Sequence, residues 1–251
     1  MKQLDYDFFT HRATMRQFAS EAPDPALIRR IVEAAVQAPN TGNMQLYSVV
    51  ETRDPENLRR MAPMHFNQPA ATSAPVILTV CADVKRFERW CEVSNAEPAM
   101  RNLQMLLAAI TDAVIFAQQI VTIAELEGLG CCYLGTVAYN APDIAGMLSL
   151  PDGVVPVVAL AIGYPAAPAA KCERLPVEAI LHSECYAKPD DAGIKELYKA
   201  KDEYEPNLGF IAENGKQTLA QVFTDVRYPA SNNIPFSLRL HEFLKAQGFD
   251  I

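Results

Sequence analysis

The chain has 251 residues, of which 50% are hydrophobic and 21% are charged. This is the composition of a globular protein, long enough for one large domain or two small ones. The formal net charge of -8 argues against a nucleic acid or an anionic membrane as partner, because binding phosphate groups needs a basic face. The start, "MKQLDYDFF", lacks the apolar stretch of a signal peptide, so we expect a cytoplasmic protein.

The first third of the chain alternates between helices and strands. Residues 4–10 predict a short helix, and 24–39 predict a longer one with a proline near its start and Pro39 as its stop. Residues 45–52 alternate and are rich in β-formers, whereas 54–62 form a short helix. The apolar, β-branched run at 74–83 predicts a buried strand.

A long apolar segment occupies residues 102–130. Polar residues interrupt it at Asp112, Gln118, Gln119 and Glu125, and charge at its centre would be costly in lipid. A helix from 100 to 127 would be roughly 40 Å long, more than a small domain needs to cross its own core. We therefore expect a central helix that is shared with a second subunit.

The remaining elements complete one α+β domain with a peripheral C-terminal arm. Residues 128–137 predict a helix stop followed by a strand, 140–150 a short helix, and 156–165 a third apolar strand. From about 187 to 230 the sequence is charged and broken by proline and glycine, and the last residues return to a helical pattern. No internal repeat or flexible linker is visible.

Several common site motifs are missing from the sequence. No G-x-G-x-x-G opens a helix after a strand, and there is no P-loop, H-E-x-x-H or G-x-S-x-G pattern. The 4 histidines form no spaced pair, so we expect surface or packing roles for them. The 6 cysteines contain no C-x-x-C, which predicts small buried side chains rather than a metal site or a disulfide framework.

The stretch "HRATMRQF" (11–18) carries the first candidate site. Arg12, Thr14 and Arg16 have the same parity, so an extended segment would point all three side chains one way. Two guanidinium groups and a hydroxyl suit a phosphate or another delocalised anion. The alternative is a solvated loop that makes surface ion pairs.

Four stretches together resemble the FMN-dependent nitroreductase and flavin reductase superfamily. They are "HRATMRQF", "AVQAPNTGNMQLY" (35–47), "GLGCCYLGTV" (128–137) and "VALAIGYPAAPAAKCERLP" (158–176), in the order and spacing of that superfamily. The nearest likeness is to its oxygen-insensitive NAD(P)H nitroreductase and flavin oxidoreductase branch. The resemblance covers roughly residues 5 to 186.

The resemblance implies a fold and a division of the chain. The fold is α+β, with a central, mostly antiparallel sheet flanked by helices and the long helix at a dimer interface. Residues 1–186 would form the FMN-binding core. Residues 187–251 would form a C-terminal arm that packs on the core and on the partner subunit.

The resemblance also assigns roles at the flavin. Arg12 would bind the FMN phosphate with Arg174, Thr14 and neighbouring Ala13 would contact the phosphate or ribityl chain, and Arg16 would lie beside N1 and C2=O of the ring. A cation there stabilises the negative charge that reduction places on the ring. The further contacts implied are Pro39, Asn40, Thr41 and Asn43 from the partner subunit, Gln68 at the ring, and the turn Tyr133, Leu134, Gly135 and Thr136 at the O4/N5 edge.

The sequence departs from this branch in two places. The branch usually has a lysine two residues before the arginine that matches Arg174, but here that residue is Cys172, and Lys171 lies one position earlier. A shift of one residue in an extended loop turns a side chain away unless a bulge re-aims it. With such a bulge, Lys171 would be a further contact of the FMN phosphate. The basic segment that binds the NADPH 2′-phosphate in relatives also has no clear counterpart, so NADPH and NADH both remain open as donors.

The implied function is a homodimeric, FMN-dependent oxidoreductase. It would take hydride from NAD(P)H and reduce a small oxidised acceptor, such as a nitroaromatic, a quinone or free flavin, by a ping-pong mechanism without a catalytic protein acid or base. Two alternatives stay open. One is a specialised relative, such as an enoate or dehalogenating reductase or a flavin-consuming enzyme, and the other is a flavin-binding protein without turnover.

Overall fold

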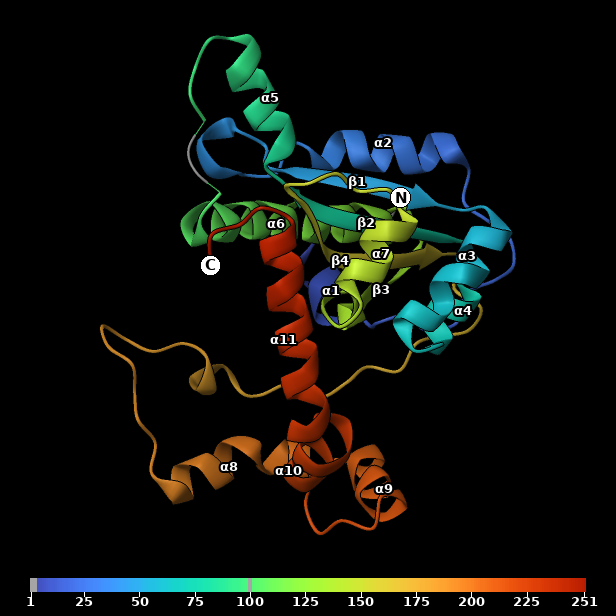
Figure 1. Ribbon diagram of the computed structural model, residues 1–251. Helices are drawn as coiled ribbons and strands as arrows, with labels where there is room; N and C mark the ends of the chain where they lie inside the picture. The colour runs from blue at the N-terminus through green and yellow to red at the C-terminus, as the bar shows by residue number, and fades with distance from the viewer. Residues whose placement is uncertain (1–3, 99–100) are drawn as a thin grey trace. The chain divides into compact units, whose positions relative to one another are not determined.

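The structure is a computed structural model that describes residues 4–98 and 101–251. Its centre is a four-stranded antiparallel sheet in the order β1-β2-β4-β3 (Figure 1). The strands are β1 (Tyr47–Thr52), β2 (Val76–Asp83), β3 (Gly130–Leu134) and β4 (Val154–Gly163). All four lie where the sequence predicts strands, and the expected α+β class is confirmed.

Helices surround this sheet. In chain order, the α-helices before residue 170 are α1 (Tyr6–Thr10), α2 (Pro25–Ala35), α3 (Pro55–Met61), α4 (Pro69–Ser73), α5 (Lys85–Val93), α6 (Leu103–Leu126) and α7 (Ala141–Met147). The short 3-10 helices are η1 (Thr41–Asn43), η2 (Ala62–His65) and η3 (Gly135–Ala138). Helices α4 and α5 were not predicted from the sequence.

Alternation along the strands places apolar side chains on both faces of the sheet. On β2, Leu78 packs in a core with α2 and α6, whereas its neighbour Ile77 packs in a second core with α3, α4 and α7. The adjacent residues Cys131 and Cys132 divide in the same way between the two cores. Because both faces are covered, the strands read as continuous apolar runs.

Helix α6 is the long apolar element that the sequence predicts. It has 24 residues and is about 36 Å long. The Asn102 side chain caps it by accepting a hydrogen bond from the Met105 amide at 3.0 Å, and Gly128, with a φ of 88°, follows its end. Within the described residues it is the one helix long and apolar enough to cross a membrane. Phe116 and Ile120 are nevertheless buried against the sheet, which makes α6 a core helix.

The chain divides into two compact units. The first contains residues up to Ala170 together with Phe236–Ile251, and the second is Lys171–Pro235. The division therefore falls after residue 170 rather than at the expected 186, and the chain's end belongs to the first unit. The physical reason is that Phe243 and Phe249 are buried in a core with Leu106.

The second unit consists of short helices. They are η4 (Val177–Ala179), α8 (Asp191–Asp202), α9 (Glu205–Glu213), α10 (Leu219–Gln221), the π-helical segment η5 (Val222–Arg227) and the first residues of α11 (Ala230–Ala246). Glu173 joins two parts of this unit, because its carboxylate accepts from the Lys201 ammonium at 2.9 Å and from the Asn207 amide at 3.0 Å.

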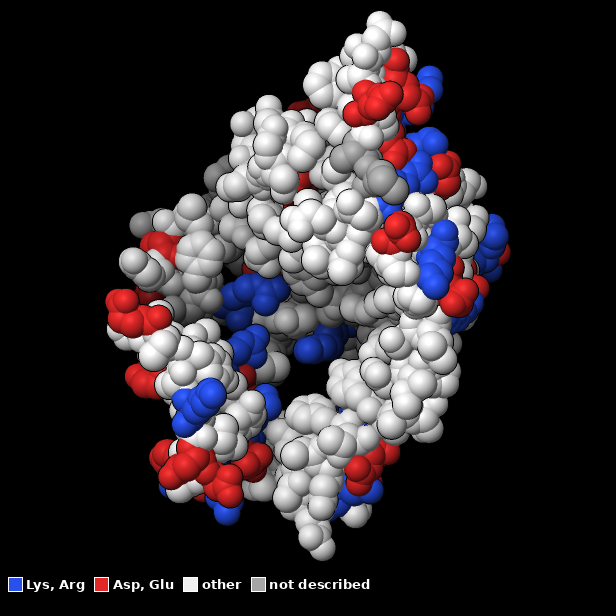
Figure 2. All heavy atoms as spheres, turned by 60° about the vertical axis from the view of Figure 1, so that its left-hand side comes forward, with Lys and Arg blue, Asp and Glu red and all other residues white. Residues whose placement is uncertain are grey.

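Figure 2 shows acidic and basic side chains next to one another at the sides of the face drawn, whereas most of that face carries no charge. Among the described residues, Arg239 pairs with Asp143 at 2.8 Å.

Candidate active site

The segment that follows α1 runs along the sheet and presents the predicted anion-binding residues. The Met15 amide donates to the Cys131 carbonyl at 3.1 Å, and the Ala19 amide donates to the Tyr164 carbonyl at 2.9 Å. Met15 is buried, whereas Arg16 next to it is exposed. The buried side chain and the two backbone bonds thus fix the segment against β3 and the end of β4.

Gly130 allows this close approach. A Cβ atom at Gly130 would lie 2.6 Å from Cβ of Met15, closer than two carbon atoms can pack. The second glycine of the "GLG" motif therefore has a physical role: it lets the extended segment lie directly on β3.

Arg12 lines a cavity of about 300 Å³. The other lining residues are Phe8, His11, Ala13, Met15, Glu125, Leu129, Gly130, Pro165 and Ala169. The guanidinium Nε lies 3.1 Å from Oε2 of Glu125 on α6 in an ion pair that is largely shielded from solvent. The same pair leaves 25% of the arginine side chain exposed where it lines the cavity. A planar guanidinium with accessible N–H donors suits an anionic oxygen, so the cavity fits a ligand that carries one.

Arg16 lies close to the same strand. Burial raises the pKa of the Cys132 thiol, and the nearby charges of Arg16 and Arg12 oppose that shift. Burial also raises the pKa of Tyr133 to about 12, again against the charge of Arg12. The charges of both guanidinium groups therefore act on β3 just before its C-terminal turn. That these side chains and Thr14 point the same way stays a prediction.

The turn that ends β3 is held by a buried histidine. Leu134 and Thr136 are buried while Gly135 is exposed. The Thr136 hydroxyl lies 2.8 Å from Nδ1 of His65, and burial lowers the pKa of His65 to about 4. The sequence analysis expected surface or packing roles for the histidines but missed this contact, which links residues 71 positions apart.

Gln68 lies three residues after His65 in the chain. It is exposed at the N-cap of α4, directly after Phe66 and Asn67, whose φ values of 54° and 50° are left-handed. These backbone conformations turn the chain between η2 and α4. Asn140 fixes η2 from the other side, because its amide donates to the Met64 carbonyl at 2.7 Å.

The polar turn at 39–43 is anchored on α6. Both the amide and the hydroxyl of Thr41 donate to Oδ1 of Asp112 at 2.8 Å. Asn40 closes the turn by accepting from the Gln45 amide at 3.2 Å, while Pro39 and Asn43 are exposed. In the sequence, Asp112 stands out only as an interruption of an apolar helix, and no local pattern indicates this role.

The two groups of candidate residues meet α6 at different places. Asp112 and Glu125 are 13 positions apart, which separates them by roughly 20 Å along the axis and by roughly 140° around it. Within one chain, Arg12 and Thr41 therefore do not converge on one phosphate-sized group. The segment that carries Arg12 and Arg16 lies beside β3, whereas the turn at 39–43 is held on α6 at Asp112.

The sequence model of the Nitroreductase family matches residues 9–164, which is more than half of the chain. The chain belongs to the nitroreductase family. The resemblance inferred from the four stretches is therefore confirmed, and the four-stranded sheet with its long helix is the sheet of a nitroreductase-family core.

Relatives along nearly the whole chain agree. The chain is 29% identical to the FMN reductase (NAD(P)H) of Bacillus subtilis, with 96% of each chain covered. It is 27% identical to the oxygen-insensitive NADPH nitroreductase of Salmonella typhimurium, with 95% of each covered. A crystal structure of a Bacteroides fragilis protein superposes with a TM-score of 0.95 at 43% identity, covering 97% of this chain and all of that one.

The last two predicted flavin contacts belong to the second unit of this nitroreductase-family chain. Lys171 and Arg174 are both exposed there. The Lys171 carbonyl accepts from the Tyr204 hydroxyl at 3.2 Å, and Arg174 donates to the Glu173 carbonyl at 2.9 Å. Their contact with a phosphate stays a prediction. Cys172 and Cys185 are exposed, so the expectation of buried cysteines is wrong for these two and correct for the other four.

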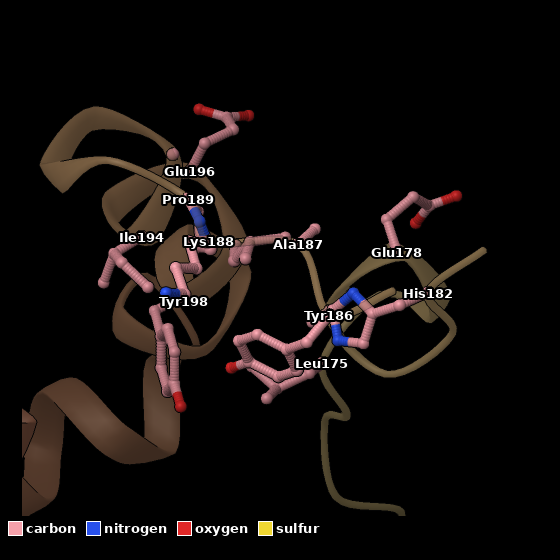
Figure 3. A pocket seen from close by; sticks show the side chains of 13 residues that line it. Leu175, Glu178, His182, Tyr186, Ala187, Lys188, Pro189, Ile194, Glu196 and Tyr198 are labelled. Carbon is pink, nitrogen blue, oxygen red and sulfur yellow. The ribbon is translucent and has the colours of Figure 1, made fainter. Parts of the chain in front are cut away.

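The second unit also has a cavity of its own, of about 470 Å³ (Figure 3). Tyr186 and Tyr198 line it together with His182, whose ring centroid lies 4.6 Å from that of Tyr186. None of the predicted flavin contacts lines this cavity, and it shares no residue with the Arg12 cavity.

Proposed function

We propose that this protein is an FMN-dependent oxidoreductase that takes hydride from NAD(P)H and reduces nitroaromatics, quinones or free flavin. The broader prediction, a flavin-dependent NAD(P)H oxidoreductase, is confirmed by the family and by the relatives. The observation that carries the site is the Arg12 cavity, where the ion pair with Glu125 at 3.1 Å holds a partly exposed guanidinium in the cavity wall.

The residues of this chain have distinct roles in the proposal. Arg12, with Ala13 and Thr14, would hold the FMN phosphate and ribityl chain, and Lys171 and Arg174 would add cations. Arg16 would stabilise negative charge at N1 and C2=O. Gln68 and the turn from Tyr133 to Thr136 would donate to the edge of the ring. When bound, FMN supplies the N5 atom that accepts hydride and passes it on.

We extend the proposal to a homodimer. The separation of the two anchor points on α6 supports this, because Pro39, Asn40, Thr41 and Asn43 would then complete the partner's site. Exposed apolar side chains on α6 offer a surface for the second copy, among them Leu103, Leu107 and Val114, which are 54%, 53% and 41% exposed. The second unit and the C-terminal helix would pack on the core and on the partner, as expected for residues 187–251.

The remaining parts of the proposal concern location and kinetics. A cytoplasmic enzyme without nucleic-acid or membrane partners agrees with the acidic charge. Donor and acceptor would stack in the same slot in turn, which predicts ping-pong kinetics.

The test is a visible absorbance spectrum of the purified protein, followed by anaerobic addition of NADH and then NADPH. A yellow protein bleached by either donor supports the proposal and identifies the donor. Turnover with nitro compounds or quinones, but not with electron-poor alkenes or halophenols, separates it from a specialised reductase. Protein that takes up no FMN contradicts it, and bound flavin that neither donor bleaches favours a flavin-binding protein without turnover.

A further inference from the structure

Asp112 is a buried carboxylate on a helix that is otherwise mostly apolar. This residue is 1% exposed, and it accepts hydrogen bonds from one short segment, residues 41–46. Oδ1 accepts from the amide and hydroxyl of Thr41 at 2.8 Å, and Oδ2 accepts from the Leu46 amide at 3.4 Å. A buried carboxylate is retained only where donors satisfy it, so Asp112 and this segment depend on each other.

The backbone between Thr41 and Leu46 is strained and depends on contacts with the rest of the chain. Gly42, Asn43 and Gln45 all have left-handed φ values, between 53° and 57°, which are costly for the two that are not glycine. On the outer side, the Arg86 guanidinium donates to the Gln45 carbonyl at 2.5 Å and to the Tyr47 carbonyl at 2.8 Å. The turn is therefore held by a carboxylate from inside and by a cation from outside.

Glu125, the second buried carboxylate of α6, holds the other half of the candidate site. It pairs with Arg12 at 3.1 Å, thirteen positions after Asp112 along the same helix. We propose that Asp112 is a positioning residue that acts in trans: it fixes the Thr41 turn that completes the flavin site of the partner subunit. Each α6 then carries one carboxylate for its own site and one for its partner's. This inference rests on the proposed function.

The first experiment measures FMN binding by apo-protein titration with Asp112→Asn, Thr41→Val and the wild type. Asp112→Asn replaces one acceptor oxygen by a donor, and Thr41→Val removes only the hydroxyl donor. We expect the Kd for FMN to rise at least tenfold for Asp112→Asn and less for Thr41→Val. Glu88→Gln is the matched control, because Glu88 is also shielded and bonded, to Arg101, but lies outside the candidate site. It should lower the melting temperature without changing the Kd.

The decisive experiment is complementation between subunits. Chains carrying Arg12→Ala and Asp112→Asn, each with a different tag, are co-expressed, and the mixed dimer is purified through both tags. In trans, one site of the mixed dimer receives both defects and the other receives neither. We therefore expect one FMN per mixed dimer bound with wild-type affinity, although each homodimer binds weakly.

The outcomes separate the two proposals. Mixed dimers with two equally weakened sites would overturn the trans assignment. An Asp112→Asn homodimer with wild-type affinity would overturn the role of Asp112 and leave the proposed function intact. Wild-type protein that binds no FMN would instead contradict the proposed function itself. If Asp112→Asn fails to fold, Thr41→Val replaces it in the mixed dimer, with the same expected stoichiometry.

Discussion

The guanidinium of Arg12 and the carboxylate of Glu125 form an ion pair at 3.1 Å between the segment after α1 and the last turns of α6. The pair joins residues 113 positions apart and keeps the cation in a fixed place, with 25% of the arginine side chain exposed. An arginine held in this way can present its planar donors to a phosphate without first losing much side-chain freedom.

Replacing Arg12 by alanine should weaken FMN binding. Charge-assisted hydrogen bonds contribute about 1.5–3 kcal/mol each, so we expect the Kd to rise roughly tenfold to a hundredfold. Arg12→Lys keeps the charge but not the planar fork and should give an intermediate Kd. Fluorescence titration of the apo-protein with FMN measures the Kd. An unchanged Kd for Arg12→Ala would show that Arg12 does not contribute to FMN binding.

Replacing Arg16 by alanine should make the bound flavin harder to reduce. Loss of a cation beside N1 and C2=O destabilises the negatively charged reduced form, so the potential falls. For a contribution of about 1.4 kcal/mol, the two-electron potential drops by about 30 mV. Anaerobic titration against a reference dye measures it. Arg16→Lys should retain part of the effect, and a potential equal to that of the wild type would count against the placement of Arg16.

Alanine at Gly130 should disturb the site through the backbone. Its Cβ would lie 2.6 Å from Met15, so the segment that carries Arg12 and Arg16 must move. We expect a loss of about 1–3 kcal/mol in the free energy of unfolding, as for overpacked cores, and weaker FMN binding. Gly146 on α7 is the control, because a Cβ there meets no atom within 4 Å and the helix gains up to about 1 kcal/mol. Urea denaturation distinguishes the two variants.

His65 should make stability depend on pH below neutrality. Burial lowers its pKa from 6.5 to about 4, so the unfolded chain binds a proton between these values while the folded chain does not. Stability should therefore fall as pH drops from about 6.5 to about 4, by up to about 3 kcal/mol from this group. In His65→Leu this contribution is missing, so the variant's unfolding free energy should fall less over the same range. If the unfolding free energy falls equally with pH in the wild type and in His65→Leu, the lowered pKa of His65 is contradicted.

Arg101 should matter for stability rather than for the flavin. It donates to Glu88 at 2.6 and 2.5 Å, to Asp152 at 2.8 Å and to the Gln247 carbonyl at 2.9 Å. Arg101→Met leaves Glu88 shielded without its cation, which costs about 3–5 kcal/mol.

The exposed pair of Arg29 and Glu33 on α2 provides the comparison for Arg101. Arg29 is 80% exposed in this pair, so Arg29→Met should cost less than about 1 kcal/mol. Thermal unfolding measures both variants. Similar melting temperatures would show that the Arg101 network contributes little.

Local patterns predicted much of the fold and part of the site. Apolar runs and alternation located the four strands and α6, and prolines near the helix starts helped to locate α2 and α3. The order and spacing of four short stretches indicated the family. Bounds differ by a few residues, as at α2, where the helix ends at Ala35 although the pattern continues to Pro39. The helix α4 escaped prediction because it has only five residues. In α5, Phe87, Trp90 and Cys91 stand at helical spacing, so the signal for this helix was present in the sequence and was missed.

What the sequence by itself determined is which side chains are available and which faces of each element are apolar, because those properties repeat with the local period of helix or strand. Only the tertiary structure decided the polar pairs: Arg12 with Glu125, Thr41 with Asp112, and His65 with Thr136. These partners are 71 to 113 positions apart, and no local period relates them. They meet because packing against one sheet buries them together, and a buried polar group must find a partner wherever the fold supplies one.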